Sequence, residues 1–253
     1  MELMEMVCVD CRFIPGLLWE DEEDPGLSTV QIYRIFINDH MSNLKQYKKL
    51  LSADEISRAK RYHHLNDHDR FIISRAVLRM LLARKLLVQP SEIVFNKGIN
   101  KKPFVGEPSN ASIEFNVAHS GEYILIAISD SPIGTDVEYM DPGFHYSEVM
   151  KFAFNENEMA SIANSASPLT TFYLLWSRKE SLLKATGKGI SDDLSVTVCL
   201  DGTNQVNASA IGSKFNWRIN SFMVGPGYIG NIAYCSDKPI YFSTVKNDRI
   251  LAD

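Results

Sequence analysis

The sequence predicts an α+β fold made of two similar halves that pack against each other. The length of 253 residues is awkward, because it exceeds one average domain and is short for two. Strand-like and helix-forming segments follow in the order strand, helix, helix, strands, and this order occurs twice. Matching residues of the two halves lie 103 positions apart. A single functional site is therefore expected at the interface between the halves.

Composition excludes several classes of protein. Hydrophobic residues make up 45% of the chain, which is enough for a sizeable core. The net charge of −5 argues against a nucleic-acid binder, because such proteins gather Lys and Arg on one surface. The apolar runs are far shorter than the roughly 20 residues that span a bilayer, so no membrane span is expected. The acidic N-terminus does not resemble a secretory signal, and we expect a cytoplasmic protein.

The cysteines and clustered histidines give only weak metal signals. Cys8 and Cys11 have the spacing of half a zinc site or of a redox pair, but no second cysteine pair accompanies them. His64 and His68 could share one helix face, yet no Glu completes an HExxH motif. A polar helix surface is the better interpretation of these histidines.

The first half begins with a strand after an acidic loop that ends in Pro-Gly at 20–26, and we expect the fold to begin at this strand, 30–37. Ser52 and Glu55 form a capping box, which predicts that a helix starts there. A second helix is expected over 67–87. Three further strands follow at 93–95, 113–117 and 123–129.

The second half repeats this order from a strand at 133–139. Glu158 corresponds to Glu55, and the pair Ser177-Arg178 corresponds to Ser74-Arg75 at the same offset. The seam is expected near Ser131-Pro132, which gives domains 1–131 and 132–253. The remaining elements predicted here are helices at 155–164 and 170–186 and strands at 196–200, 217–222 and 229–235.

Two carboxylates lie on the first strand of the second half. Asp136 and Glu138 are two residues apart, so on a strand both side chains point to the same face. Such a pair could provide half of an oxygen-ligand metal site. An amphipathic strand with one solvated face is the alternative.

A charged pair borders the buried face of the helix at 170–186. Trp176 lies at the centre of this face, and Glu180 and Lys184 lie about 40° and 80° from it at 100° per residue. The first-half residues that match Glu180 and Lys184 are Val77 and Leu81. One half thus has charges where the other has core residues, which indicates one functional site. An ordinary surface pair remains the alternative.

Together these segments resemble the surfactin-type (Sfp-like) 4′-phosphopantetheinyl transferases. Their signature, Gly-x-Asp-x-Glu followed by Trp-Ser-x-Lys-Glu-Ser/Ala-x-x-Lys, corresponds to 134–138 and 176–184. The segments 101–104 and 115–121 resemble the Gly-Lys-Pro and Asn-x-Ser-His-Ser motifs, and the likeness runs from about 51 to 189. Three departures concern the coenzyme A pocket: Lys101 replaces a Gly, Ala118 replaces a Ser, and Glu55 stands where some relatives have a basic residue.

The resemblance implies the fold of these transferases and their reaction. They transfer 4′-phosphopantetheine from coenzyme A to a serine of an acyl or peptidyl carrier protein and release 3′,5′-ADP. Mg²⁺, or Mn²⁺ in its place, would be held by Asp136, Glu138 and Glu180. Glu180 would also accept the serine proton, and Lys184 would neutralise the diphosphate. The residues expected to hold the adenosine and its 3′-phosphate are Arg58, Arg70, Lys102 and His119.

Two rival functions use the same residues. One is a module that binds coenzyme A or a carrier protein without turnover, and the other is a Mg²⁺-dependent diphosphate hydrolase. Arg58 and Arg70 could also be ordinary surface cations. Residues 142–154 contain aromatic side chains that could contact a carrier protein, although a helix core explains at least half of them. The fused halves favour a monomer.

Overall fold

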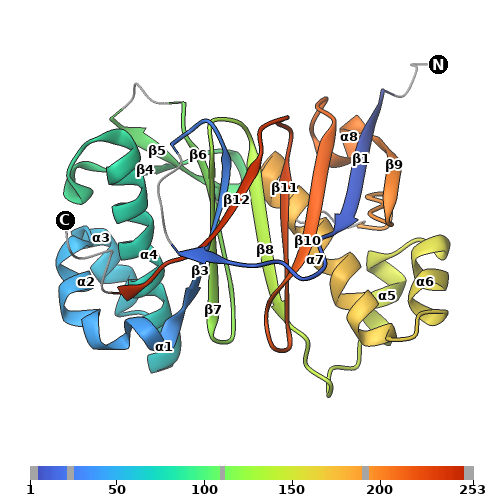
Figure 1. Cartoon of the computed structure of the whole chain (residues 1–253), viewed down its shortest axis with the longest axis horizontal. Helices are drawn as coiled ribbons and strands as arrows, with labels where there is room; N and C mark the ends of the chain where they lie inside the picture. Colours follow the sequence, from blue (N-terminus) through green and yellow to red (C-terminus); the bar gives the residue numbers. More distant parts are fainter. Residues whose placement is uncertain (1–4, 22–25, 109–111, 190–193, 248–253) are drawn as a thin grey trace.

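The computed structural model describes residues 5–21, 26–108, 112–189 and 194–247. Two five-stranded sheets lie at the centre of the molecule, and helices flank them on both sides (Figure 1). The first-half sheet has the strand order β2-β12-β3-β7-β6, and the second-half sheet has the order β8-β11-β10-β1-β9. None of the described helices is long and apolar enough to cross a membrane.

The first half contains a helical layer and most of one sheet. Its elements are β3 (Val30–Phe36), α1 (Ile37–His40), η1 (Met41–Asn43), α2 (Leu44–Leu50), α3 (Ala53–Ala59), α4 (Leu65–Leu86), η2 (Pro90–Glu92), β4 (Val94–Lys97), η3 (Ile99–Lys101), β5 (Pro103–Glu107), β6 (Glu114–Ser120) and β7 (Tyr123–Ser129). β4 and β5 form a separate two-stranded sheet.

The second half repeats this plan, and strands from both ends of the chain complete the two sheets. Its elements are β8 (Ile133–Tyr139), α5 (Ser147–Ala153), α6 (Glu156–Ala163), α7 (Pro168–Thr186), β9 (Gly202–Asn207), α8 (Ala208–Ile211), β10 (Trp217–Gly225) and β11 (Tyr228–Tyr234). The terminal strands are β1 (Met6–Phe13), β2 (Glu20–Asp21) and β12 (Ile240–Thr244).

The sequence repeat corresponds to a repeat of topology. In each half the first strand pairs antiparallel with the last, and the last pairs antiparallel with the strand before it, giving β3-β7-β6 and β8-β11-β10. The predicted capping box of Ser52 and Glu55 is present, and Asn155 forms the same box with Glu158. The predicted arrangement of two similar α+β halves is confirmed.

The terminal strands cross between the halves. β1 pairs in parallel with β10 of the second half, and β12 pairs in parallel with β3 of the first half. The expectation that the fold begins near residue 30 was wrong, because β1 is an inner strand of the second-half sheet. The division into 1–131 and 132–253 stays a prediction, and these two strands lie across it.

One predicted strand is absent. Residues 196–200 contain no strand in the described structure, although Cys199 is fully buried. The Cys199 N–H donates to the Glu158 carboxylate, and its carbonyl accepts from Arg178. Charged side chains thus satisfy this backbone in place of a neighbouring strand, and the apolar pattern alone does not reveal that.

The sheets bury both faces. On β3, Val30 and Ile32 belong to the core between the two sheets, whereas Tyr33 and Ile35 belong to the core shared with α4. This alternation follows from the two-residue period of a strand. The two sheets therefore stack back to back with helices outside, an arrangement visible in Figure 1.

The halves also meet along β6 and β8. The N–H of Thr135 donates to Oδ1 of Asn116 at 2.9 Å, and the N–H of Tyr139 donates to Oγ of Ser120 at 3.0 Å. Both bonds run from the backbone of β8 to side chains of β6. This seam fixes the strand that carries the two predicted carboxylates against the first half.

Candidate active site between the two halves

A glycine allows helix α7 to lie directly on strand β8. A Cβ atom built on Gly134 would be 2.1 Å from the carbonyl oxygen of Ser181 and 2.3 Å from the nitrogen of Ala185. Real Cβ atoms essentially never come so close to a backbone, so this contact requires glycine. The Gly of the Gly-x-Asp-x-Glu signature thus sets the distance between the helix and the carboxylates of the strand.

The predicted acids and lysine come together on this helix–strand contact. Nε1–H of Trp176 donates to Oε1 of Glu138 at 3.2 Å, and Nζ of Lys184 donates to Oδ1 of Asp136 at 2.6 Å. Glu180 lies one turn from each of these helix residues and is buried. The side chains singled out on the strand and on the helix therefore share one site.

Burial makes these carboxylates hard to ionise. It raises the pKa of Glu138 to about 7, with help from the charge of Asp136, and it raises the pKa of Asp136 despite the ion pair with Lys184. Burial likewise raises the pKa of Glu180, which Lys184 partly opposes. Burial disfavours the Lys184 ammonium, but the three surrounding acids raise its pKa overall, Asp136 most strongly. The site therefore gathers three largely buried carboxyl groups around the single ammonium of Lys184.

The donor set fits a hard divalent cation. Oδ2 of Asp136 and Oε1 of Glu180 are buried and have no hydrogen-bond partner among the described residues. Carboxylate oxygens in this state suit Mg²⁺, which prefers oxygen ligands. Within that part of the chain no three His, Cys, Asp or Glu side chains are already arranged around a metal position. The ammonium of Lys184 lies on Asp136 instead.

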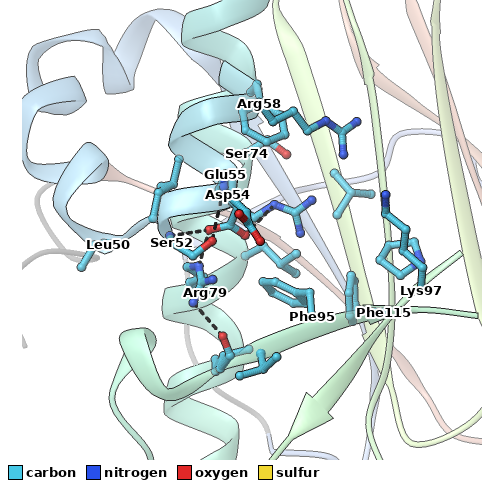
Figure 2. A pocket seen from close by; sticks show the side chains of 18 of the residues that line it. Leu50, Ser52, Asp54, Glu55, Arg58, Ser74, Arg79, Phe95, Lys97 and Phe115 are labelled. Carbon is cyan, nitrogen blue, oxygen red and sulfur yellow. Dashed lines mark hydrogen bonds and ion pairs between the residues drawn. The ribbon is translucent and has the colours of Figure 1, made fainter. Parts of the chain in front are cut away.

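A basic cavity of ≈ 730 Å³ opens in the first half. It is lined from α3, α4, β4 and β6, and Figure 2 shows Arg58 and Lys97 extending into it above the rings of Phe95 and Phe115. The volume falls within the roughly 300–1,000 Å³ that small-molecule sites occupy. The cations that line it are Lys49, Arg58, Arg61, Arg70, Arg75, Arg79, Lys97 and Lys101.

Three of the four residues predicted for the nucleotide line this cavity. They are Arg58, Arg70 and His119. Lys102 does not line it, because its Nζ donates to the carbonyls of Ile133 at 3.2 Å and Ala185 at 2.9 Å. These two residues lie on β8 and α7, so Lys102 fastens the turn before β5 to the helix–strand contact.

His119 connects the cavity with the acidic site. Desolvation lowers its pKa, and the positive charges of Arg70 and Lys184 lower it further. Arg70 lines the cavity and Lys184 lies among the carboxylates, so His119, whose pKa both charges lower, lies between the cavity and the acidic site. Because its pKa is below the ordinary value, His119 is a neutral imidazole at pH 7 in the free protein.

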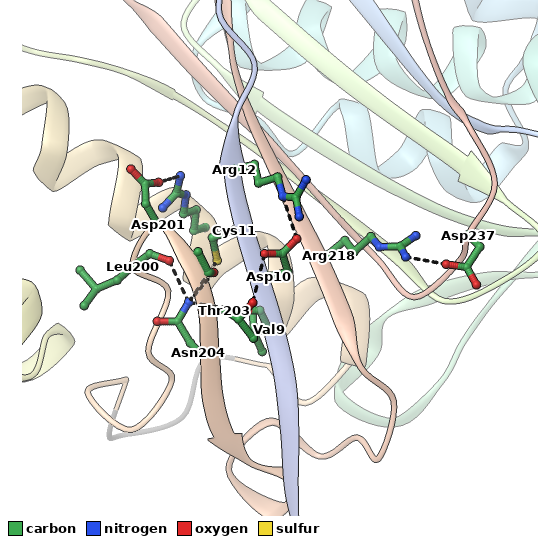
Figure 3. Close-up of polar contacts among 12 residues, drawn as sticks. Val9, Asp10, Cys11, Arg12, Leu200, Asp201, Thr203, Asn204, Arg218 and Asp237 are labelled. Atoms are coloured by element: carbon green, nitrogen blue, oxygen red, sulfur yellow. Dashed lines mark hydrogen bonds and ion pairs between the residues drawn. The ribbon is translucent and has the colours of Figure 1, made fainter.

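Two charged residues inside the helix signature have structural roles. Lys179 is fully buried and donates to Glu158 at 2.7 Å. Arg178 is also fully buried and donates to the Ser221 hydroxyl, the Cys199 carbonyl and the Asp201 carboxylate. Figure 3 shows the Asp201 contact beside the strands of the second half. These residues anchor α7 and keep Glu180 in place.

The other regions singled out in the sequence lie away from these contacts. Part of 142–154 forms α5, and Phe144 and Phe152 are exposed there. Cys11 is buried in the second-half core, while Cys8 accepts from the Gln205 amide. No metal site involves them within the described residues. The sequence reasoning missed Arg75 and Arg79 in the cavity, although two arginines one helical turn apart were a visible signal.

Comparisons with known proteins agree with this arrangement. Residues 132–233 match the 4′-phosphopantetheinyl transferase superfamily, and 38–131 match the N-terminal part of a 4′-phosphopantetheinyl transferase. The slr0495 protein of Synechocystis, assigned to these transferases, is 41% identical over 179 residues, covering 69% of this chain and 73% of its own.

Two further relatives also match the chain. The 4′-phosphopantetheinyl transferase Sfp of Bacillus subtilis is 29% identical over 83% of this chain and 93% of its own. The 4′-phosphopantetheinyl transferase HetI of a Nostoc species is 30% identical over 69% of this chain and 75% of its own. With its two matched parts, its repeated fold and its acidic helix–strand site, the chain belongs to the 4′-phosphopantetheinyl transferase superfamily.

Proposed function

We propose that this protein transfers the 4′-phosphopantetheine group of coenzyme A to a serine hydroxyl of an acyl or peptidyl carrier protein and releases 3′,5′-ADP. The observation that carries this proposal is the pairing of two unlike sites across the seam. Buried carboxylates and Lys184 lie on one side, and an arginine-rich cavity of nucleotide size lies on the other. Coenzyme A offers a diphosphate to the first and an adenosine 3′-phosphate to the second.

Asp136, Glu138 and Glu180 would hold Mg²⁺, or Mn²⁺ in its place, and Oδ2 of Asp136 and Oε1 of Glu180 have no hydrogen-bond partner among the described residues. When bound, the metal neutralises charge on the diphosphate. Lys184 has a third of its side chain exposed and lies on Asp136, so it can turn toward a phosphate while staying close to the acids. The chain's own cation therefore shares the neutralisation of the leaving group.

Glu180 would accept the proton of the carrier serine. Its raised pKa makes its carboxylate a stronger base than an exposed glutamate. As the proton moves to Glu180, the serine oxygen forms a bond to the phosphorus of the phosphopantetheine group. The bond from that phosphorus to the bridging oxygen breaks, and the oxygen leaves on 3′,5′-ADP. Lys184 stabilises the charge that this oxygen gains.

The cavity would hold the adenosine and its phosphate. Arg58, Arg70 and His119 line it and remain the proposed contacts, joined by Lys97 and Lys101. Arginine suits phosphate because its planar donors can form two parallel hydrogen bonds. In this scheme Lys102 acts as a positioning residue, since it ties the turn before β5 to β8 and α7.

We also propose that the protein acts as a monomer and that both predicted domains contribute to the site. β1 lies beside β10 and β12 lies beside β3, so the chain itself covers these strands. The exposed rings of Phe144 and Phe152 on the α5 side are candidate carrier contacts. The cytoplasmic location stays a prediction from sequence.

A mass measurement tests the transferase proposal. The protein is incubated with coenzyme A, Mg²⁺ and an apo carrier protein, and intact carrier is weighed by mass spectrometry. We expect a gain of one phosphopantetheine group, which Glu180→Gln should slow by at least about 100-fold. Absence of any gain over a panel of acyl and peptidyl carriers would overturn the proposal. Cleavage of coenzyme A without a carrier would favour the hydrolase, and binding alone would favour the module without turnover.

A further inference from the structure

An asparagine on β11 lies directly opposite one of the proposed metal ligands. Asn231 pairs with Asp136 in the antiparallel register of β11 and β8. Residues paired in this way point to the same face of the sheet, with Cβ atoms about 4.5–5.5 Å apart. Oγ1–H of Thr135 donates to the Asn231 carbonyl at 2.7 Å, which helps to fix this register. The side chain of Asn231 is therefore a close neighbour of the Asp136 carboxylate.

One oxygen of Asn231 is left over. The residue is fully buried, and its Nδ2 donates to Oγ of Ser177 on α7 at 2.5 Å. Its Oδ1 has no hydrogen-bond partner among the described residues. A buried acceptor in this state costs free energy, so a cation or a hydrogen-bond donor that reaches Oδ1 is bound favourably.

Two carboxylate oxygens in the same state belong to the neighbouring elements. They are Oδ2 of Asp136 on β8 and Oε1 of Glu180 on α7, and within the described part of the chain neither has a hydrogen-bond partner. Ser177, the residue that Asn231 contacts, precedes Glu180 by three positions, so both lie on one side of α7. Because α7 packs on β8 and on β11, three unsatisfied acceptor oxygens belong to one contact region.

The first half shows that the fold does not require an amide at this position. Tyr33 stands 103 residues before Asp136, and Ile126 lies opposite Tyr33 in the pairing of β3 with β7. Both residues are buried in the apolar core that includes α4. An apolar side chain therefore fits this position of the repeated unit, and packing of the helix on the sheet does not explain why Asn231 is polar.

We propose that Asn231 is a further member of the divalent-cation site and that its neutral carbonyl oxygen shares the binding of the ion with the three carboxylates. This role rests on the proposed function, which places Mg²⁺ or Mn²⁺ at Asp136, Glu138 and Glu180. Hard cations accept amide carbonyl oxygens as well as carboxylates. An amide also adds a donor without adding negative charge to a site that already gathers three acids.

Titration with Mn²⁺ alone tests this assignment without requiring turnover. Wild-type protein, Asn231→Leu and Asn231→Asp are titrated in the absence of coenzyme A, and free Mn²⁺ is measured by electron paramagnetic resonance. Leucine has nearly the shape of asparagine without its polar atoms, so Asn231→Leu should weaken Mn²⁺ binding about 10- to 100-fold. Aspartate keeps the oxygen and loses the donor to Ser177, so Asn231→Asp should bind Mn²⁺ at least as tightly as the wild type.

Urea unfolding with a chelator present separates this role from a structural one. If Asn231 only held α7 through Ser177, both variants would lower the unfolding midpoint and leave Mn²⁺ affinity unchanged. We expect Asn231→Leu to keep or raise the midpoint, because it removes a buried acceptor that lacks a partner in the described structure. Ser177 keeps its own acceptor, since its hydroxyl donates to the Tyr173 carbonyl at 2.6 Å.

Ser243→Ala is the matched control. Oγ of Ser243 is also buried without a hydrogen-bond partner among the residues described, but it lies on β12 of the other sheet. Its removal should leave Mn²⁺ affinity unchanged.

Three results would overturn the proposal. The first is wild-type affinity for Mn²⁺ in Asn231→Leu, and the second is equal weakening in Asn231→Leu and Asn231→Asp. The third is a wild type without any Mn²⁺ binding that Asp136→Asn abolishes, because the acids would then hold no cation. If Asn231→Leu does not fold, Asn231→Asp decides, and a loss of Mn²⁺ affinity in that variant contradicts the proposal.

The two proposals fail separately. Weaker Mn²⁺ binding by Asn231→Leu, in a protein that transfers no phosphopantetheine, would contradict the proposed function and leave the role of Asn231 intact. Transfer by the wild type, together with an unchanged Mn²⁺ affinity in Asn231→Leu, would do the reverse.

Discussion

The two halves place a capping glutamate at the same point and use it differently. Glu158 is fully buried, and its carboxylate binds the fully buried ammonium of Lys179 at 2.7 Å. Glu55 is 12% exposed and faces two arginines beside the cavity. In the second half the backbone of Leu194 and Cys199 closes around the ion pair. In the first half the comparable region stays open.

This difference shows how one repeated unit can give two functions. The second half uses its buried charges to hold α7 on the strand that carries the acids. The first half keeps arginines at the surface of a cavity, where they can meet a ligand. The helix–strand contact diverges as well, because Gln31 stands in the first half where Gly134 stands in the second.

Breaking the buried ion pair should have the largest effect. Glu158→Gln would leave the Lys179 ammonium buried without its carboxylate, and we expect a loss of about 3–5 kcal/mol in the free energy of unfolding. Glu55→Gln should cost less than half of that. The side chain of Arg75 is 16% exposed, and Arg79 also donates to the carbonyls of Pro90 and Ile93. Urea unfolding of both variants measures the contrast. Equal losses would show that the two glutamates are equivalent after all.

Closing the helix–strand contact should come next. Gly134→Ala would place a Cβ 2.1 Å from the Ser181 carbonyl, so α7 must move away from β8. A displacement of about 1 Å at a reacting group can cost about 100-fold in rate, and we expect that loss of transfer activity. Gln31→Ala, the matching change in the first half, should alter the rate by less than about threefold, since the hydrogen bonds of Gln31 to described residues all lie within its own half. A fully active Gly134→Ala would show that the close contact is dispensable.

Local patterns allowed much of this molecule to be predicted. The two-residue spacing of Asp136 and Glu138 and the one-turn spacing of Glu180 and Lys184 fix side-chain directions without knowledge of the fold. The repeat then indicated that the halves correspond, and the resemblance indicated that the two segments meet. These features depend on short stretches of chain, where the geometry of strand and helix is regular.

The features that the sequence did not predict correctly depend on long-range contacts or on irregular backbone. Nothing local in β1 or β12 indicates that each joins the sheet of the opposite half. Lys101 lines the cavity, whereas the sequence predicted that Lys102 would do so. The turn before β5 explains this difference, because Asn100 and Lys101 have φ angles of 58° and 63° there. This left-handed backbone reverses the expected side-chain directions. The burial of Arg178 and Lys179 depends on the segment 194–201, which folds over them.

The acids should give the metal-free protein a pH dependence that originates in the second half. The pKa of Glu138 is about 7 in the folded protein and 4.5 in the unfolded chain, so between these values the folded state retains a proton that the unfolded state releases. Stability should therefore fall as pH rises from about 5 to 7, with a slope of at most about 1.4 kcal/mol per pH unit for this residue. The matching residue of the first half is Ile35, which does not titrate.

Glu138→Gln tests the origin of this slope. Unfolding free energies measured at several pH values with a chelator present should depend less steeply on pH in the variant than in the wild type. Asp136 and Glu180 also have raised pKa values, so a part of the slope should remain. An unchanged slope in Glu138→Gln would place the titration elsewhere.

The two capping boxes should give the smallest and most direct comparison of the halves. The Asn155 side chain accepts the Glu158 N–H at 2.9 Å, whereas the Ser52 hydroxyl accepts the Glu55 N–H at 3.3 Å on a more exposed helix end. Loss of such a cap typically costs about 0.5–2 kcal/mol. We expect Asn155→Ala in the upper part of this range, because it also loosens a glutamate whose ammonium partner has no access to water, and Ser52→Ala in the lower part.

Ser52→Ala should have a second, functional effect that Asn155→Ala lacks. Without the cap, Glu55 gains freedom beside Arg75 and Arg79 in the cavity wall, so binding of coenzyme A should weaken by about two- to threefold. Thermal unfolding and calorimetric titration on the two variants give both quantities. If Asn155→Ala changed nucleotide affinity and Ser52→Ala did not, the capping glutamate of the second half would govern the cavity, and the division of roles between the halves would be wrong.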